Sequence, residues 1–188
     1  MNYEIGDIIL MRSIPRENKK WYYNLFTKMQ NFFDGKASHS EIICEYNAQT
    51  KTVKTLGVNT DGLKFRHWNV EDINIAIVRV NGMNSKKAEY VLNIMKNDIG
   101  QKYSYEGLIF NASINTVMDK IFPKLWKKKT IIKDERIRFC SEFVGEFIKR
   151  TMNKKLSRKN EKNIHNNVLT PSDIYKSYDV TILKDFGV

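Results

Sequence analysis

An amphipathic segment that begins at a cysteine is the feature that most constrains how this chain folds. Its apolar residues recur at the spacing of one buried helical stripe, at Phe143, Val144, Phe147 and Ile148. Charged residues fall on the opposite side, at Glu142, Glu146 and Lys149. Cys140 therefore lies in the first turn of a helix, where unpaired backbone N–H groups and the helix dipole favour a thiolate. The segment predicts either a nucleophilic cysteine or a small buried residue that begins a core helix.

Short extended segments dominate residues 1–80. The expected strands are Ile5 to Met11, Ser38 to Tyr46, Lys51 to Val58, Leu63 to Trp68 and Ile73 to Val80. We expect the first to lie inside a sheet, and the second and third to form a β-hairpin that turns at Asn47 to Thr50. Expected helices cover Lys19 to Phe33, a segment capped by Ser85 and stopped by Gly100, and an irregular stretch over 114–126. Val180 to Leu183 is expected to close the sheet.

Histidine is the base most often paired with a cysteine nucleophile, and the chain has three. Alternation along the second strand places His39 and Glu41 on one face and Cys44 on the other, so a carboxylate stands beside His39 to orient it. His67, in a predicted turn, and His165, in a polar loop, are interpreted as solvated or packing residues. His39 is therefore the expected base for Cys140.

The sequence shows no pattern typical of a disulfide framework, a metal site or a phosphate-binding loop. Cys44 and Cys140 are the two cysteines, almost a hundred residues apart, so the sequence indicates no disulfide framework. Three scattered histidines and two distant cysteines show no zinc-ligand spacing, and no glycine-rich phosphate loop precedes a helix. No metal and no cofactor are expected.

Positive charge is concentrated in one region. Of the net charge of +11, the stretch from Lys120 to Lys162 contributes fifteen Lys and Arg against five Asp and Glu. This surplus, with Lys127, Lys128 and Lys129 beside the amphipathic stretch 114–126, suits an anionic membrane or cell-wall surface. A nucleic-acid partner and a merely solvated surface are the alternatives.

The length and apolar content of the chain limit the number of domains that it can form. With 188 residues, 41% of them hydrophobic, it can bury a full core as one domain. The first residues include acids and form no secretory signal, and no apolar run is long enough to span a membrane. We therefore expect a cytoplasmic protein, with peripheral membrane contact as an alternative.

Five short motifs occur in a recognisable order. They are Gly6-Asp7-Ile8-Ile9-Leu10, Ser38-His39-Ser40-Glu41-Ile42, Gly100-Gln101-Lys102-Tyr103, Phe139-Cys140-Ser141-Glu142-Phe143-Val144 and Leu169-Thr170-Pro171-Ser172-Asp173. In this order they resemble the circularly permuted papain-like proteins of the YiiX-like branch of the NlpC/P60 superfamily. A closer likeness is to a phage and prophage group with an Asp-Gly turn and a basic, aromatic strand, here residues 60–68.

The resemblance implies an α+β fold in which an antiparallel sheet packs against helices. It implies one permuted NlpC/P60-like domain over residues 1–188, with a basic helical insertion around 107–135. It also implies that Cys140 is the nucleophile, that His39 is the base, and that Tyr103 and Thr55 lie in the substrate region. The third catalytic residue is left open between Glu41 and Thr55.

The functional expectation is a thiol hydrolase that forms an acyl-enzyme on Cys140. The resemblance implies amide bonds of peptidoglycan-type peptides as its substrate. The first alternative is a lipid acyl hydrolase or acyltransferase at a membrane surface. The second is a non-catalytic basic binding protein that keeps the same fold.

Overall fold

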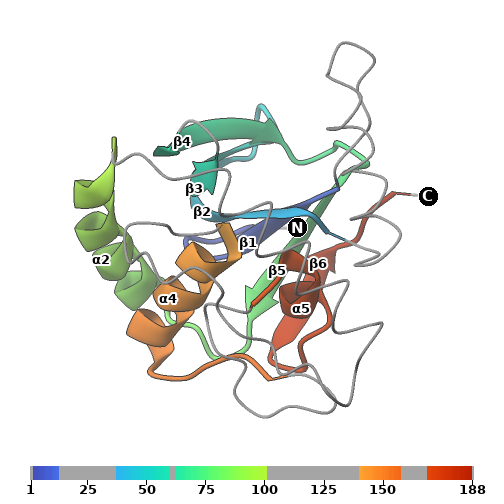
Figure 1. Ribbon diagram of the computed structural model, residues 1–188. Helices are drawn as coiled ribbons and strands as arrows, with labels where there is room; N and C mark the ends of the chain where they lie inside the picture. Colours follow the sequence, from blue (N-terminus) through green and yellow to red (C-terminus); the bar gives the residue numbers. More distant parts are fainter. Residues whose placement is uncertain (1, 13–36, 60–61, 101–139, 158–168, 188) are drawn as a thin grey trace, which may run out of the picture.

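The computed structural model describes residues 2–12, 37–59, 62–100, 140–157 and 169–187. Within these ranges the architecture is α+β, with helices packed on one face of a six-stranded antiparallel sheet (Figure 1). In their order across the sheet, the strands are β4 (Gly62–Asn69), β3 (Thr52–Asn59), β2 (His39–Asn47), β1 (Ile8–Met11), β5 (Ile75–Val80) and β6 (Val180–Lys184). The expected fold class is confirmed.

Strand β1 lies inside the sheet, between β2 and β5, as its apolar sequence predicts. Its alternating side chains enter two different apolar clusters. Ile8 and Leu10 pack on the helix face, whereas Ile9 and Met11 pack on the other face. Because all four are buried, both faces of the sheet are covered around β1.

The predicted hairpin of β2 and β3 is also confirmed. At its turn the side-chain oxygen of Asn47 accepts hydrogen bonds from the backbone N–H groups of Gln49 (3.0 Å) and Thr50 (3.1 Å). The hairpin pairs Ile43 with Thr55, and a register irregularity follows between Ile43 and Glu45.

The helices are α2 (Ser85–Met95), α4 (Cys140–Met152) and α5 (Pro171–Tyr175). Figure 1 shows α2 and α4 side by side, and α4 packs against β2 and β3. Phe143 and Phe147 of α4 are fully buried, as their helical spacing predicts. Gly6 passes so close beneath the helices that a Cβ there would lie 2.8 Å from the Cβ of Ala88. Its φ of +95° also favours glycine.

Several predicted boundaries were wrong. β1 begins at Ile8 rather than Ile5, because Glu4 and Asp7 form a turn in which the Asp7 N–H donates to the Glu4 carbonyl (3.1 Å). β5 begins at Ile75 rather than Ile73. Helix α2 ends at Met95 and continues as a 3₁₀ turn over Lys96–Asp98, before the predicted stop at Gly100.

The cap of α2 was also assigned to the wrong residue. The Asn84 side chain accepts a hydrogen bond from the Lys87 N–H at 3.1 Å and caps the helix. Ser85, which the sequence predicted as the cap, instead donates its hydroxyl to Glu4 at 2.8 Å. Asn and Ser are about equally good caps, so the position of the backbone decides between them.

Three predicted elements lie outside the described residues: the helix over 19–33, the irregular helix over 114–126 and the basic insertion around 107–135. The single-domain assignment stays a prediction. None of the helices in the described ranges is long and apolar enough to cross a bilayer.

The corrected cap leads to a stability prediction. Asn84→Ala should lower the free energy of unfolding by roughly 1 kcal/mol, because the first turn of α2 loses the acceptor for the Lys87 N–H. Ser85→Ala is the matched control and should cost clearly less, since its hydrogen bond to Glu4 is exposed. Urea unfolding followed by circular dichroism measures both, and a larger loss for Ser85→Ala would contradict the assignment.

Candidate active site

The first residue of α4 and the first residue of β2 meet at one end of the sheet. There the side chains of Cys140 and His39 are hydrogen-bonded to each other. Cys140 is 8% exposed and the His39 side chain 20% exposed, so solvent reaches the pair from the side of the imidazole. The nucleophile and base predicted from the sequence are thus brought into contact.

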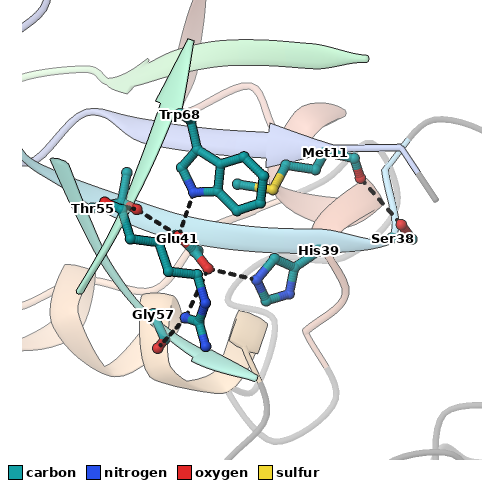
Figure 2. A network of polar contacts seen from close by, with 8 residues as sticks. Met11, Ser38, His39, Glu41, Thr55, Gly57 and Trp68 are labelled. Atoms are coloured by element: carbon teal, nitrogen blue, oxygen red, sulfur yellow. Dashed lines mark hydrogen bonds and ion pairs between the residues drawn. The ribbon is translucent and has the colours of Figure 1, made fainter. Parts of the chain in front are cut away.

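Glu41 holds the other side of the imidazole. The Nε2 atom of His39 lies 2.9 Å from Oε1 of Glu41, with both side chains on the same face of β2 (Figure 2). Because Nε2 faces the carboxylate, Nδ1 is the ring nitrogen left to face the Cys140 sulfur. The order Cys140, His39, Glu41 is that of a nucleophile, a base and a group that orients the base.

The carboxylate of Glu41 is fully buried and receives three further donors from β3 and β4. Thr55 Oγ1 (2.5 Å) and Trp68 Nε1 (2.9 Å) donate to Oε2, and Arg66 Nη1 (3.1 Å) donates to Oε1. Figure 2 shows the Thr55 and Trp68 side chains converging on Glu41. A buried carboxylate needs such partners, because an unpaired one would strongly disfavour folding.

Strand register explains how these donors meet. Thr55 on β3 pairs with Arg66 on β4, and Trp68 follows two residues later on the same face as Arg66. Gly57 supplies the space: a Cβ there would lie 2.3 Å from Cγ of Glu41, so any larger residue would collide with the carboxylate's stem. Arg66 also donates to the Gly57 carbonyl, at 3.0 Å.

The environment keeps Glu41 ionised. Burial alone would raise the pKa of Glu41, but the hydrogen bond and charge of His39, with the hydrogen bonds of Thr55 and Trp68, lower it below its usual value. A carboxylate at this position stabilises a positive imidazole.

The same interactions favour an ion pair between His39 and Cys140. Burial opposes both charges, yet the thiolate and the hydrogen bonds of Cys140 and Glu41 raise the pKa of His39 to about 10. Burial would likewise raise the pKa of Cys140, but the charge and hydrogen bond of His39, together with hydrogen bonds from Ser40, lower it. Both shifts therefore favour the imidazolium–thiolate ion pair over the neutral pair.

Cys44 has the opposite electrostatics. It is half-buried on the helix face of β2, and its sulfur lies 3.7 Å from the Ile42 carbonyl. Burial is the main reason that its pKa is raised to about 11. The pKa of Cys44 therefore lies above that of Cys140.

The other predicted site residues lie as follows. Thr55 is fully buried against Glu41. His67 lies in β4, as the extended segment expected over 63–68 predicts, and not in a turn; it is exposed and points away from the face of Arg66 and Trp68. Tyr103, His165 and the lysines 127–129 lie outside the described residues.

Arg66 and Trp68 contact Glu41 but were not selected from the sequence. The available signal was their spacing of two in a basic, aromatic segment, which places them on one face of a strand. That signal does not identify the residue they face, because Glu41 is 25 residues from Arg66 and 27 from Trp68.

Comparison with known proteins gives one informative result. Neither the family models nor the curated protein sequences gave a match. The fold is similar to that of the crystal structure of the metalloprotein yiiX from Escherichia coli O157:H7, with a TM-score of 0.57 and 13% sequence identity over 98% of each chain. This likeness supports a YiiX-like fold; the circular permutation and the place within the NlpC/P60 superfamily stay predictions.

Because that neighbour is a metalloprotein, we tested whether the site here suits a metal ion. Within the described residues, no group of three or more His, Cys, Asp or Glu side chains is arranged to hold one. Both oxygens of Glu41 already accept hydrogen bonds, one of them from the cationic Arg66. His39, Glu41 and Cys140 therefore do not fit a metal centre.

The two cysteines should differ in reactivity. At about pH 6 to 7 iodoacetamide should alkylate Cys140, whose lowered pKa supplies thiolate there. Cys44 should react appreciably only as the pH approaches its pKa of about 11. Peptide mapping after timed labelling of the folded protein measures both, with urea-unfolded protein as the control in which the two thiols react alike. Preferential labelling of Cys44 would contradict the nucleophile assignment.

The reactivity of Cys140 should depend on the negative charge of Glu41 more than on the shape of its side chain. Glu41→Gln should slow alkylation of Cys140 near neutral pH by about tenfold, because the imidazolium loses its anionic partner and less thiolate forms. Thr55→Val is the matched control, since it removes one donor to Glu41 but keeps the carboxylate beside His39, and it should have a smaller effect. Equal rates for Glu41→Gln and wild type would show that Glu41 does not support the ion pair.

Proposed function

We propose that this chain is a thiol hydrolase that cleaves amide bonds through an acyl-enzyme on Cys140. The observation that carries the proposal is that His39 is hydrogen-bonded to Cys140 on one side and to the buried carboxylate of Glu41 on the other. A thiolate, a proton carrier and an orienting anion are the parts that acyl transfer to cysteine requires.

In the first step the Cys140 thiolate attacks the carbonyl carbon of the substrate and a C–S bond forms. The carbonyl oxygen takes the negative charge, and the backbone N–H of Cys140, at the first residue of α4, can donate to it. When the intermediate collapses, the C–N bond breaks and the leaving amine takes a proton from the His39 imidazolium. The products are a free amine, a thioester and a neutral imidazole.

In the second step His39 removes a proton from water, and the resulting hydroxide attacks the thioester carbonyl. The C–S bond breaks, the carboxylic acid leaves, and the thiolate and imidazolium are restored. Glu41 stays ionised throughout, because its hydrogen bonds with His39, Thr55 and Trp68 lower its pKa. Its role is to hold the ring and to stabilise the imidazolium.

Peptidoglycan-type peptides are the substrate class we propose, on the resemblance of the five motifs. A lipid acyl hydrolase or acyltransferase would use the same acyl-enzyme and differ in its leaving group or acceptor. The lysines 127–129, proposed as a contact for an anionic membrane or wall polymer, bear on that choice. A non-catalytic binding protein would form no acyl-enzyme.

Intact-mass spectrometry with acyl donors tests the proposal. Incubation with muropeptides should add an acyl mass to Cys140, whereas phospholipid vesicles should not. Cys44→Ser should form the same adduct and Cys140→Ala none. His39→Ala should slow acylation by about 10² or more, because it removes the proton donor of the amine.

Acylation of Cys140 from phospholipid alone would support the alternative of a lipid acyl hydrolase or acyltransferase. Absence of any adduct from either donor, in protein whose Cys140 still reacts selectively with iodoacetamide, would contradict a hydrolase for these two substrate classes.

A further inference from the structure

Ser40 carries a hydroxyl that the proposed mechanism does not use. The residue lies between His39 and Glu41 on β2, pairs with Leu10 of β1, and is fully buried. Strand alternation places its side chain on the face opposite to theirs, which is the face that α4 covers. Within the described residues, its Oγ atom forms no hydrogen bond of regular geometry. A buried hydroxyl without a partner disfavours folding, so its surroundings need an explanation.

The polar group that Ser40 meets on this face is the sulfur of Cys140. The backbone N–H and the hydroxyl of Ser40 lie close enough to the sulfur to lower the pKa of Cys140, although the hydroxyl makes no hydrogen bond of regular geometry to it. Ser40 therefore contacts the sulfur from the strand, on the side away from Glu41. A hydroxyl that has no stronger acceptor can turn its proton to the sulfur when the sulfur is charged.

Other buried hydroxyls around the site donate hydrogen bonds to groups other than the sulfur of Cys140. Ser141, the neighbour of Cys140, donates to the Leu169 carbonyl at 2.5 Å. Thr55 donates to Glu41, and Ser172 donates to the Ala37 carbonyl at 3.1 Å. Among the described residues, Ser40 is thus the buried hydroxyl that remains for the sulfur.

We propose that Ser40 is a positioning residue that donates a hydrogen bond to the resting thiolate of Cys140 and loses it when the sulfur becomes a thioester. This inference rests on the proposed function, because it requires a thiolate nucleophile. A charged sulfur accepts a hydrogen bond far better than a neutral thioester sulfur. Ser40 therefore helps to set the pH at which Cys140 ionises, and it holds the sulfur beside His39 before substrate arrives.

Few other charged groups bear on Cys140 within the described residues. His39 of β2 acts on Cys140 directly, and Glu41 of β2 acts through His39, with Arg66 of β4 beside it. Glu142 lies on α4 itself, and Asp173 of α5 accepts hydrogen bonds from Thr170 in the cap of that helix. The side chains that α2 and β3 bury beneath α4 are apolar. Because Ser40 is uncharged, its replacement leaves all these charges in place.

The test is the pH profile of Cys140 in a Cys44→Ser background, followed by thiolate absorbance and by the rate of iodoacetamide alkylation. Ser40→Ala should raise the ionisation midpoint by about one pH unit, a roughly tenfold loss of thiolate below the midpoint. Rates should converge at high pH, where both variants are fully ionised. Ser40→Thr keeps a hydroxyl and should keep the midpoint near that of the background.

Thr151 provides a matched control, because among the described residues its hydroxyl is the other buried one that forms no hydrogen bond. It lies eleven residues beyond Cys140 on α4, roughly 16 Å along the axis. Thr151→Val should leave the midpoint unchanged, and a shift equal to that of Ser40→Ala would overturn the proposal. A thermal melt of each variant confirms folding.

Failure of this inference is distinguishable from failure of the proposed function. A lowered midpoint in the background protein that Ser40→Ala does not move would overturn the role of Ser40 alone. A midpoint at the ordinary value for cysteine in the background protein would overturn the thiolate nucleophile, and with it the role of Ser40.

Discussion

The buried carboxylate of Glu41 is the constraint on which the site depends. A charge removed from water must be surrounded by donors, and Glu41 obtains them from its own strand and from two others. A one-residue slip of β3 or β4 would carry these donors to the opposite face, so the pairing register and the polar network support each other. Gly57 shows how closely the strands and the network fit together, because the stem of Glu41 occupies the space that a side chain at position 57 would need.

The hydrogen bonds around Glu41 also influence the charges of His39 and Cys140. Two cations, His39 and Arg66, lie beside the Glu41 anion, and Cys140, whose pKa His39 lowers, is the group that can supply a second anion. Cys44 shows what the network adds, since the same side chain in apolar surroundings has a raised pKa. The two thiols differ in neighbours rather than in burial alone, because burial raises the pKa of both.

A likeness in fold by itself does not carry chemistry from one protein to another. The backbone arrangement is shared over almost the whole chain, at 13% identity. Here the side chains that could bind a metal are already engaged with one another: His39 is held by Glu41, and Glu41 by Thr55, Arg66 and Trp68. Such an arrangement suits proton transfer, which needs a fixed imidazole.

The sequence by itself determined the features that depend on local periodicity. Alternation in β2 placed His39 and Glu41 on one face, and the helical stripe after Cys140 placed the cysteine at a helix start, because side-chain direction repeats every two residues in a strand and about every 3.6 in a helix. Local periodicity does not fix the boundaries of an element: Asn84 and Ser85 are equally suitable caps, and only the backbone path distinguishes them.

The tertiary structure decided which distant residues meet. Arg66, Trp68 and Thr55 reach Glu41 through the pairing of β2 with β3 and of β3 with β4, and no local pattern encodes that register. It also decided that Ser40 faces the sulfur of Cys140. The directions of the pKa shifts of His39, Glu41 and Cys140 follow from this packing, because a pKa depends on the charges and donors within a few ångströms, and these come from segments far apart in the chain.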